Sequence, residues 1–265
     1  MATSKPDQPE GRNADQALPP FTLGVDIGGT NIKASVLDRA GLLLADQVRL
    51  PTPKPATPEA VLEATGRLAA RLPPFDRISV GFPGVVKGGT TLTAPNLGTG
   101  LWAGFKLIEA LASRFGTPVR LLNDAAVQGL GVVEGNGLEC VLTLGTGVGC
   151  ALFRNRRLLL HLELGQYWAC DSRTYDEHIG QAALLAVGED VWNRRVAEAV
   201  TAVSELTCCD VLYIGGGNAR KITFALPPHV RIVSNTAGIT GGVRLWEPDL
   251  DELFRDEPMA QEKRA

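Results

Sequence analysis

The chain has 265 residues, of which 45% are hydrophobic and 21% are charged, and its formal net charge at pH 7 is −3. This composition is typical of a globular protein, and the length suffices for one large domain or two smaller ones. The small negative charge gives no general attraction to nucleic acid, and no apolar run is long enough to span a bilayer. We therefore expect neither nucleic acid nor a membrane as a partner.

Residues 1–20 are polar, with scattered Gly, Asn, Asp and Pro, which predicts a disordered tail. This tail lacks the apolar stretch of a signal peptide and is too short for a helix-turn-helix domain. The cysteines form neither a CxxC pair nor a cluster with metal-ligand spacing, so we expect reduced thiols in a cytoplasmic protein and no structural zinc. They are Cys140, Cys150, Cys170, Cys208 and Cys209.

The first structured stretch, residues 22–37, has two short apolar runs on either side of a glycine turn. Each run predicts a strand, because it is rich in β-branched residues or alternates in polarity. Gly28 and Gly29, followed by Thr30, permit a tight reversal whose backbone N–H groups can bind phosphate oxygens. Asp26, at the end of the first strand, suits a hydrated Mg²⁺ ion. Taken alone, the stretch is equally well interpreted as an ordinary β-hairpin.

The residues up to 122 alternate between strands and helices, which is an α/β pattern. The predicted helix that begins at Pro58 has Thr57 as its cap. The predicted elements are a strand at 42–50, a proline-rich connector at 51–58, a helix from Pro58 to about Leu72, a strand at 77–82, a helix at 105–115 and a strand at 118–122.

Asn123 and Asp124 follow this last strand, where a helix begins. From position alone, helix capping is the more common role for Asp124. The carboxyl end of a strand in an open α/β sheet is also where ligands bind. A carboxylate there can accept the proton of an attacking hydroxyl in phosphoryl transfer.

The second half repeats the first hairpin, because residues 140–153 again place a turn, Gly145-Thr146-Gly147, between two apolar runs. The repetition indicates an internal duplication with two lobes and a cleft between them, where ligands often bind. Glu163 ends another apolar run and is either a sugar-hydroxyl acceptor or a surface carboxylate. The basic turn at 154–157 is either a solvated hairpin tip or a contact for a polyanionic donor.

The rest of the chain predicts two helices, then a strand that ends in a third glycine turn, Gly215-Gly216-Gly217, against which an extended donor can lie. The predicted elements here are helices at 176–187 and 189–206, strands at 210–214 and 231–234, a helix at 238–245 and a loose, charged tail from Glu247.

Several of these motifs fall in the order found in sugar kinases of the ROK family, which the chain resembles from roughly residue 23 to 243. They are Asp26-Ile-Gly-Gly-Thr30, Asn123-Asp124, Leu144-Gly-Thr-Gly-Val-Gly149, Glu163-Leu-Gly165 and Ile214-Gly-Gly-Gly217. Residues 51–60, 81–86 and 142–147, and the lack of a cysteine-rich zinc motif, resemble one branch, the polyphosphate glucokinases. Each motif alone is weak, but the combination is specific.

The resemblance implies the actin-like ATPase fold, with two ribonuclease-H-like lobes around a cleft. We therefore expect a disordered tail at 1–20, an N-terminal lobe at 21–123, a C-terminal lobe at 124–246 and a charged tail at 247–265. A homodimer is also implied.

The implied reaction transfers a phosphoryl group from polyphosphate, ATP or both to the 6-hydroxyl of glucose or a related hexose, with Asp124 as general base and Mg²⁺ held near Asp26 through water. The implied sugar-binding residues are Asn96, Asn123, Asp124, Glu163 and Gln166. The implied phosphate- or nucleotide-binding residues are Asp26, Gly28, Gly29, Thr30, Lys33, Gly145, Thr146, Gly147, Gly215, Gly216 and Gly217.

The family's sugar motif ends in His, whereas this chain has Gln166 there. A Gln amide can preserve one hydrogen bond but not a titratable group, so the identity of the hexose stays open. Donor preference stays open too, because a polyphosphate track is built from scattered basic residues such as Lys87, Arg154 and Arg157. The alternative function is a non-catalytic sugar-binding or regulatory protein on the same fold.

Overall fold

The structure is a computed structural model that describes residues 17–170, 172–234 and 236–254. Most of the predicted N-terminal tail and the last eleven residues of the predicted C-terminal tail, 255–265, lie outside this part of the chain. Within it, no helix is both long and apolar enough to cross a membrane.

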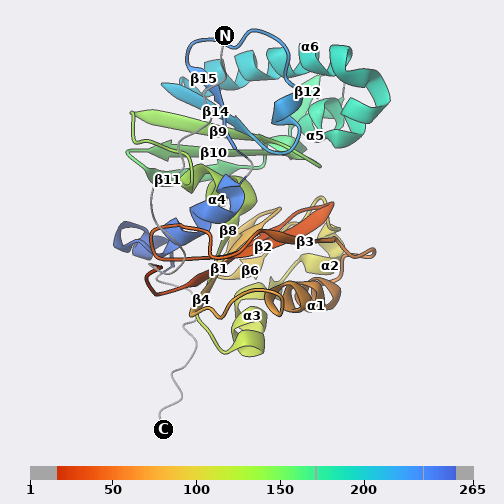
Figure 1. Ribbon diagram of the computed structural model, residues 1–265. Helices are drawn as coiled ribbons and strands as arrows, with labels where there is room; N and C mark the ends of the chain where they lie inside the picture. Colours follow the sequence, from red (N-terminus) through yellow and green to blue (C-terminus); the bar gives the residue numbers. More distant parts are fainter. Residues whose placement is uncertain (1–16, 171, 235, 255–265) are drawn as a thin grey trace.

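Two five-stranded sheets form the framework of the molecule, and the second repeats the order of the first (Figure 1). The first has the order β3-β2-β1-β4-β8, and the second has the order β11-β10-β9-β14-β15. Each starts from an antiparallel glycine-turn hairpin, β1/β2 or β9/β10. One edge of the hairpin gains an antiparallel strand, β3 or β11, and the other edge gains two parallel strands, β4 and β8 or β14 and β15. This correspondence agrees with the duplication predicted from the two hairpins.

The strand bounds are β1 Thr22–Ile27, β2 Asn31–Leu37, β3 Val48–Pro51, β4 Arg77–Phe82, β8 Val119–Asn123, β9 Leu138–Leu144, β10 Val148–Arg154, β11 Arg157–Leu162, β14 Val211–Gly215 and β15 Val230–Ile232. Two small sheets add β5 Val86–Lys87, β6 Thr90–Thr91 and β7 Phe105–Lys106, and β12 Trp168–Cys170 and β13 Arg173–Thr174. The predicted strand at 42–50 is shorter than expected: apart from a single bridge at Leu43, only Val48–Pro51 pairs with β2.

Helices pack on each of the two sheets (Figure 1). α1 (Pro58–Ala69) and α3 (Leu107–Phe115) pack on the first sheet, and α6 (Gln181–Thr207) packs on the second. α1 begins as predicted, since the Thr57 hydroxyl accepts the Ala60 N–H and Pro58 is its first residue. α6 is interrupted at Gly188 (φ 78°, ψ 167°), just before the second predicted helix. The first predicted helix, 176–187, is not continuous, because the extended backbone at Gly180 separates α5 (Tyr175–Ile179) from the start of α6.

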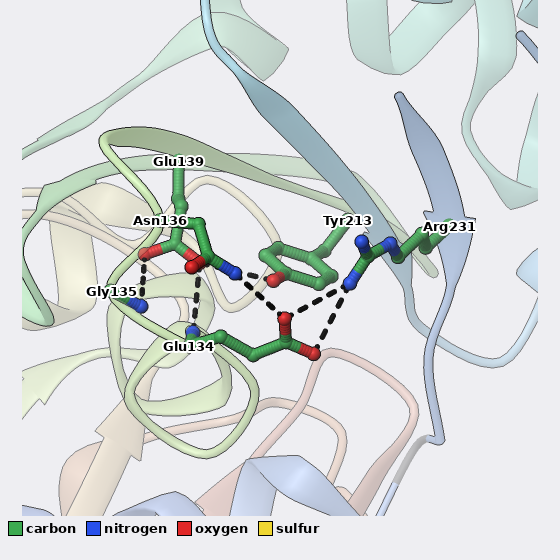
Figure 2. A network of polar contacts seen from close by, with 6 residues as sticks. All are labelled: Glu134, Gly135, Asn136, Glu139, Tyr213 and Arg231. Atoms are coloured by element: carbon green, nitrogen blue, oxygen red, sulfur yellow. Dashed lines mark hydrogen bonds and ion pairs between the residues drawn. The ribbon is translucent and has the colours of Figure 1, made fainter. Parts of the chain in front are cut away.

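The short helix α4 (Asp124–Leu130) lies between the two sheets and contacts both (Figure 1). The loop after it is held by Glu139, whose fully buried carboxylate accepts the N–H groups of Glu134 and Gly135 and the hydroxyl of Tyr213. Figure 2 shows this network, which Glu134 extends to the guanidinium of Arg231. Such a satisfied carboxylate fixes the exit of α4 relative to the second sheet.

The chain returns to the first sheet at its C-terminal end. The Ser79 hydroxyl donates to the Gly242 carbonyl at 2.7 Å, and the indole N–H of Trp246 donates to the same hydroxyl at 2.8 Å. The guanidinium groups of Arg77 and Arg120 lie 4.9 and 4.6 Å from the centre of the Trp246 ring. Both contacts are close enough for cation–π attraction.

This ordered return extends beyond Trp246 and differs from the loose tail predicted from Glu247. Residues Pro248–Phe254 form a 3₁₀ helix in which Leu250 and Phe254 are buried, with Arg120 over the Phe254 ring. The apolar side chains carry the segment into the core in spite of its charge. The remaining elements are α2 Thr99–Trp102, α5 Tyr175–Ile179, α7 Ala237–Thr240 and the 3₁₀ helices η2 Leu164–Gln166, η3 Ala219–Lys221 and η4 Gly241–Trp246.

Candidate active site

A polar cleft of about 390 Å³ collects residues from both lobes. All but one of the residues that the sequence predicts for the site line it. They are Asp26, Gly28, Gly29, Thr30, Lys33, Asn96, Asn123, Asp124, Gly145, Thr146, Gly147, Glu163, Gln166, Gly216 and Gly217. The exception is Gly215, which faces α4 instead: a Cβ there would lie 2.5 Å from Nε2 of Gln128.

The two predicted phosphate turns meet across this cleft. The hydroxyl oxygens of Thr30 and Thr146 are 2.9 Å apart and share a hydrogen bond. A Cβ at Gly29 would lie 3.0 Å from Cγ2 of Thr146, so only glycine allows this approach without displacement. The first turn is itself held by Thr52, whose hydroxyl donates to the Gly28 carbonyl at 2.6 Å.

The second turn is held in place by hydrogen bonds from two other segments of its own lobe. The Gln181 N–H at the start of α6 and Nδ2 of Asn218 both donate to the Gly145 carbonyl, at 3.0 and 3.2 Å. The third glycine turn packs against the same strand end. Gly216 has φ +86°, and a Cβ there would lie 2.3 Å from the carbonyl oxygen of Leu144. Two of the three glycine turns are thus held together at the end of β9.

Asn123, not Asp124, is the cap of α4. Its Oδ1 accepts the N–H groups of Ala125 and Ala126 at 2.9 and 3.3 Å, and its Nδ2 donates to the Gly84 carbonyl at 3.2 Å. The capping role considered for Asp124 therefore belongs to its neighbour. Asp124 is the first residue of the helix, with Oδ1 2.8 Å from the Ala125 nitrogen and the carboxyl group in the cleft.

The Asp124 carboxyl group titrates near neutrality. Burial, together with the negative charges of Asp26 and Glu163, raises its pKa to about 7, against the opposing effect of the Ala125 N–H. Asp26 in turn forms an ion pair with Lys33, with 2.9 Å between Nζ and Oδ2. A carboxylate with such a pKa can both accept and release a proton at neutral pH.

A fourth carboxylate of the cleft, Asp176, was not predicted from the sequence. Its Oδ1 accepts the Val148 N–H at 2.7 Å, and its Oδ2 accepts Nε2 of Gln166 at 2.8 Å. Burial raises its pKa. The spacing of Thr174 and Glu177, which form a capping box, was the signal that places this residue in the first turn of a helix. Other lining residues that were missed are Arg49, Gln128, Gln181, Asn218 and Arg220.

The basic turn at 154–157 is the tip of the β10/β11 hairpin and does not line the cleft. Arg157 lies 3.9 Å from a carboxylate oxygen of Asp249, as in an ordinary surface ion pair. The tip is exposed, as a solvated hairpin end would be, and a contact with a polyanionic donor outside the cleft stays a prediction.

The oxygen ligands of the cleft suit Mg²⁺. Asp26 and Asp124 face the same space closely enough for the charge of one to raise the pKa of the other. Mg²⁺ prefers one or two such carboxylates together with phosphate oxygens. Among the described residues, no group of three or more His, Cys, Asp or Glu side chains forms a protein-only metal site.

Comparison with known proteins agrees with this geometry. The model of the ROK family matches residues 22–161. The polyphosphate glucokinase of Mycobacterium leprae is 31% identical over 244 residues, which are 86% of this chain and 75% of that protein. The polyphosphate glucokinase of Mycobacterium tuberculosis is 31% identical over 239 residues, which are 82% of this chain and 88% of that protein.

Solved structures show the same architecture. The inorganic polyphosphate/ATP-glucomannokinase of an Arthrobacter species superimposes with a TM-score of 0.77 at 30% identity, over 85% of this chain and 98% of that one. A glucokinase of Streptomyces griseus, solved with glucose and AMPPNP, shares the fold with a TM-score of 0.71 at 21% identity, over 85% of this chain and 98% of that one.

Two duplicated lobes with a glycine-turn cleft between them define a sugar kinase of the hexokinase type on the actin-like ATPase fold. The chain belongs to the ROK family, as the order of its motifs predicts. Its similarity extends to the polyphosphate glucokinases, the branch that residues 51–60 and 81–86 resemble.

Proposed function

We propose that the protein transfers a phosphoryl group from polyphosphate, ATP or both to the 6-hydroxyl of glucose or a related hexose. The observation that carries this proposal is the position of Asp124. Its carboxyl group, with a pKa of about 7, lies in a cleft between two glycine turns whose threonines touch. A base beside two phosphate-binding turns is the arrangement that phosphoryl transfer needs.

In this proposal the hexose lies against Asn96, Asn123, Glu163 and Gln166, with its 6-hydroxyl toward Asp124. The Asp124 carboxylate takes the hydroxyl proton as the oxygen attacks the terminal phosphorus of the donor. Glu163 suits a sugar hydroxyl, because its charge acts on Asp124 and therefore lies close to the reacting end. Asn123 has less freedom to bind sugar, since its oxygen is already used to cap α4.

The donor phosphates lie between the turns Gly28-Gly29-Thr30 and Gly145-Thr146-Gly147, with Lys33 beside them. Mg²⁺ held through water at Asp26 would neutralise charge on the transferred phosphoryl group. The far end of the donor extends along Gly216 and Gly217, which line the cleft, whereas Gly215 is turned toward α4. Contact between the lobes at Thr30 and Thr146 helps to exclude water from the phosphorus.

A product assay tests the proposal. The purified protein is incubated with Mg²⁺, a panel of hexoses and either ATP or polyphosphate, and sugar phosphates are detected by mass spectrometry. We expect product from at least one hexose, and we expect Asp124→Asn to lower kcat by orders of magnitude while sugar binding persists. The matched control is Asp190→Asn, an exposed carboxylate on α6 outside the cleft.

Two outcomes would contradict the proposal. Undiminished turnover in Asp124→Asn would show that another group is the base. No product with any donor, from a folded protein that still binds sugar, would favour a non-catalytic sugar-binding or regulatory role. A cytoplasmic location and a homodimer also remain part of the proposal, and the mass measured by light scattering during gel filtration tests the dimer.

A further inference from the structure

Gln166 stands where the family's sugar motif has His, and its side chain is already bound to a protein group. Its Nε2 donates to Oδ2 of Asp176 at 2.8 Å, while the other oxygen of Asp176 accepts the Val148 N–H at 2.7 Å. The backbone of Gln166 is held as well, because its N–H donates to the Glu163 carbonyl within η2. All three side chains, Glu163, Gln166 and Asp176, line the cleft.

Asp176 has no room to turn away from this contact. A Cβ at Gly165 would lie 2.3 Å from its Oδ1, and a Cβ at Gly147 would lie 2.8 Å from either oxygen, so both glycines pack directly on the carboxylate. The backbone is fixed too, since Asp176 lies in the first turn of α5, which starts at a Thr174–Glu177 capping box. Asp176 is therefore a rigid group on the wall of the cleft.

The chemistry of the two side chains determines the direction of the amide. An ionised carboxylate only accepts hydrogen bonds, so the amide must turn its NH₂ group toward Asp176. The carbonyl oxygen of Gln166 then points the other way and is available to the cleft. A histidine nitrogen at this position could donate or accept, whereas the carbonyl oxygen that the paired glutamine turns to the cleft can only accept from a sugar.

We propose that Asp176 is a positioning residue that holds the Gln166 amide with its carbonyl oxygen toward the bound hexose. The acceptor sugar must therefore carry a hydrogen-bond donor at the ring position that faces Gln166. This inference rests on the proposed sugar-kinase function, and it assigns to a residue outside the family motif the control over which sugars react.

Deoxyfluoro sugars test the inference, because fluorine replaces a hydroxyl group at similar size but donates no hydrogen bond. The kcat/KM values of the preferred hexose and of its analogues, fluorinated in turn at each non-reacting carbon, are measured at pH 8. For the wild type we expect a loss of at least about tenfold at the carbon that faces Gln166, since a site built for a hydroxyl donor rejects analogues that lack it.

Two variants separate positioning from general damage. In Asp176→Asn, the asparagine oxygen still accepts the Val148 N–H, so its NH₂ faces Gln166 and reverses the glutamine amide. The loss at that one carbon should then shrink to less than about threefold. Adding Gln166→Glu to Asp176→Asn again presents an acceptor oxygen to the sugar. The double variant should therefore regain the loss of kcat/KM for the analogue fluorinated at that carbon. If Asp176 had a purely structural role, the second substitution would not restore this loss.

The inference is overturned if Asp176→Asn lowers kcat/KM equally for the hexose and for every analogue, or if the double variant fails to restore the discrimination. A wild type without any position-specific loss overturns it as well. If no sugar is phosphorylated, the proposed function fails instead. The same analogue series is then measured as dissociation constants by calorimetry, and the same pattern across variants is expected there.

Discussion

Asp124 combines two properties that conflict at neutral pH, because its carboxyl group is needed as a charged base but lies where burial opposes charge. Its pKa of about 7 reflects this conflict, with burial as the largest cause and the charge of Asp26 as the second. The base is therefore only partly ionised at pH 7. Two predictions follow from this residue, one for the rate and one for the stability.

The rate should depend on pH as expected for a single base. If Asp124 must be ionised to accept the proton, kcat/KM falls tenfold for each pH unit below about 7 and becomes constant above it. Steady-state assays from pH 5 to 9 with saturating Mg²⁺ measure the profile. A profile without a break between pH 6 and 8 would contradict this prediction.

The stability should change in the opposite sense. The folded-state pKa of Asp124 is raised above its unfolded value of about 4, so the folded protein binds the proton more tightly and its free energy of unfolding falls as pH rises from about 4 to about 7. Asp124→Asn removes this pH-dependent loss of stability, because asparagine does not ionise. We expect the variant to be more stable than the wild type at pH 8, by at most about 4 kcal/mol, and to lose that gain at pH 4.

Urea denaturation at pH 4 and pH 8 measures this difference between the variant and the wild type. Asp190→Asn, exposed on α6, is the control and should show no pH-dependent gain. A variant less stable than the wild type at pH 8 would mean that the ionised carboxylate is well solvated in the cleft.

The residues of the site were predictable where a local motif carries them. Asp26, Thr30 and Asp124 each belong to a short motif at the end of a strand, and all three line the cleft. Asp176 was missed because its role depends on Gly147 and Gly165, which come from other parts of the chain and allow its approach. The expectation from position that Asp124 caps α4 was wrong, because the preceding Asn123 is an equally good capping residue and takes this role.

At the scale of elements, the glycine turn after β14 shows how one backbone position supports the donor site. Gly216 has φ +86°, and a Cβ there would overlap the Leu144 carbonyl, whereas a Cβ at Gly217 would meet nothing within 4 Å. We expect Gly216→Ala to lower the free energy of unfolding by at least about 1–3 kcal/mol and to weaken donor binding.

Gly217→Ala is the matched control, and we expect it to leave the stability within about 0.5 kcal/mol of the wild type. Thermal or urea unfolding compares the two variants. Equal stability of both would show that the backbone at Gly216 relaxes without cost.

Elements were predicted well where one residue type sets a boundary. Thr57 and Pro58 start α1, and Gly188 interrupts α6, because these effects act over a few residues. The prediction of a strand over the whole of 42–50 was wrong, because strand pairing depends on residues far away in the sequence. Apolar residues of this stretch pack against the core of the first lobe, but only Val48–Pro51 pairs with a neighbouring strand. Local alternation of polar and apolar residues does not determine which strands pair.

At the scale of the whole molecule, the two lobes touch at the hydroxyl groups of Thr30 and Thr146, 2.9 Å apart. Thr30→Val removes this hydrogen bond and keeps the size of the side chain. We expect the ratio of donor hydrolysis to sugar phosphorylation to rise by about threefold or more, because a looser contact admits water. Measuring free phosphate and sugar phosphate together gives the ratio.

Thr30→Ser keeps the hydroxyl group and is the control, with a ratio close to that of the wild type. An unchanged ratio in Thr30→Val would show that this contact does not limit the entry of water. The two-lobed plan behind this prediction was foreseeable, since the repeated hairpin motif indicates a duplication. The return of the chain to its first lobe was not, because Ser79 and Gly242 meet through contacts with no local signature.

That return has a consequence for how the protein is made. Ile239 and Val243 pack on Leu37, and a Cβ at Gly24 would already touch Ile239, so the last part of the chain closes the core of the first lobe. On the ribosome the first sheet emerges long before the segment that covers it. An unfinished chain therefore exposes apolar surface that the finished chain hides, which gives chaperones and proteases a physical means of telling the two apart.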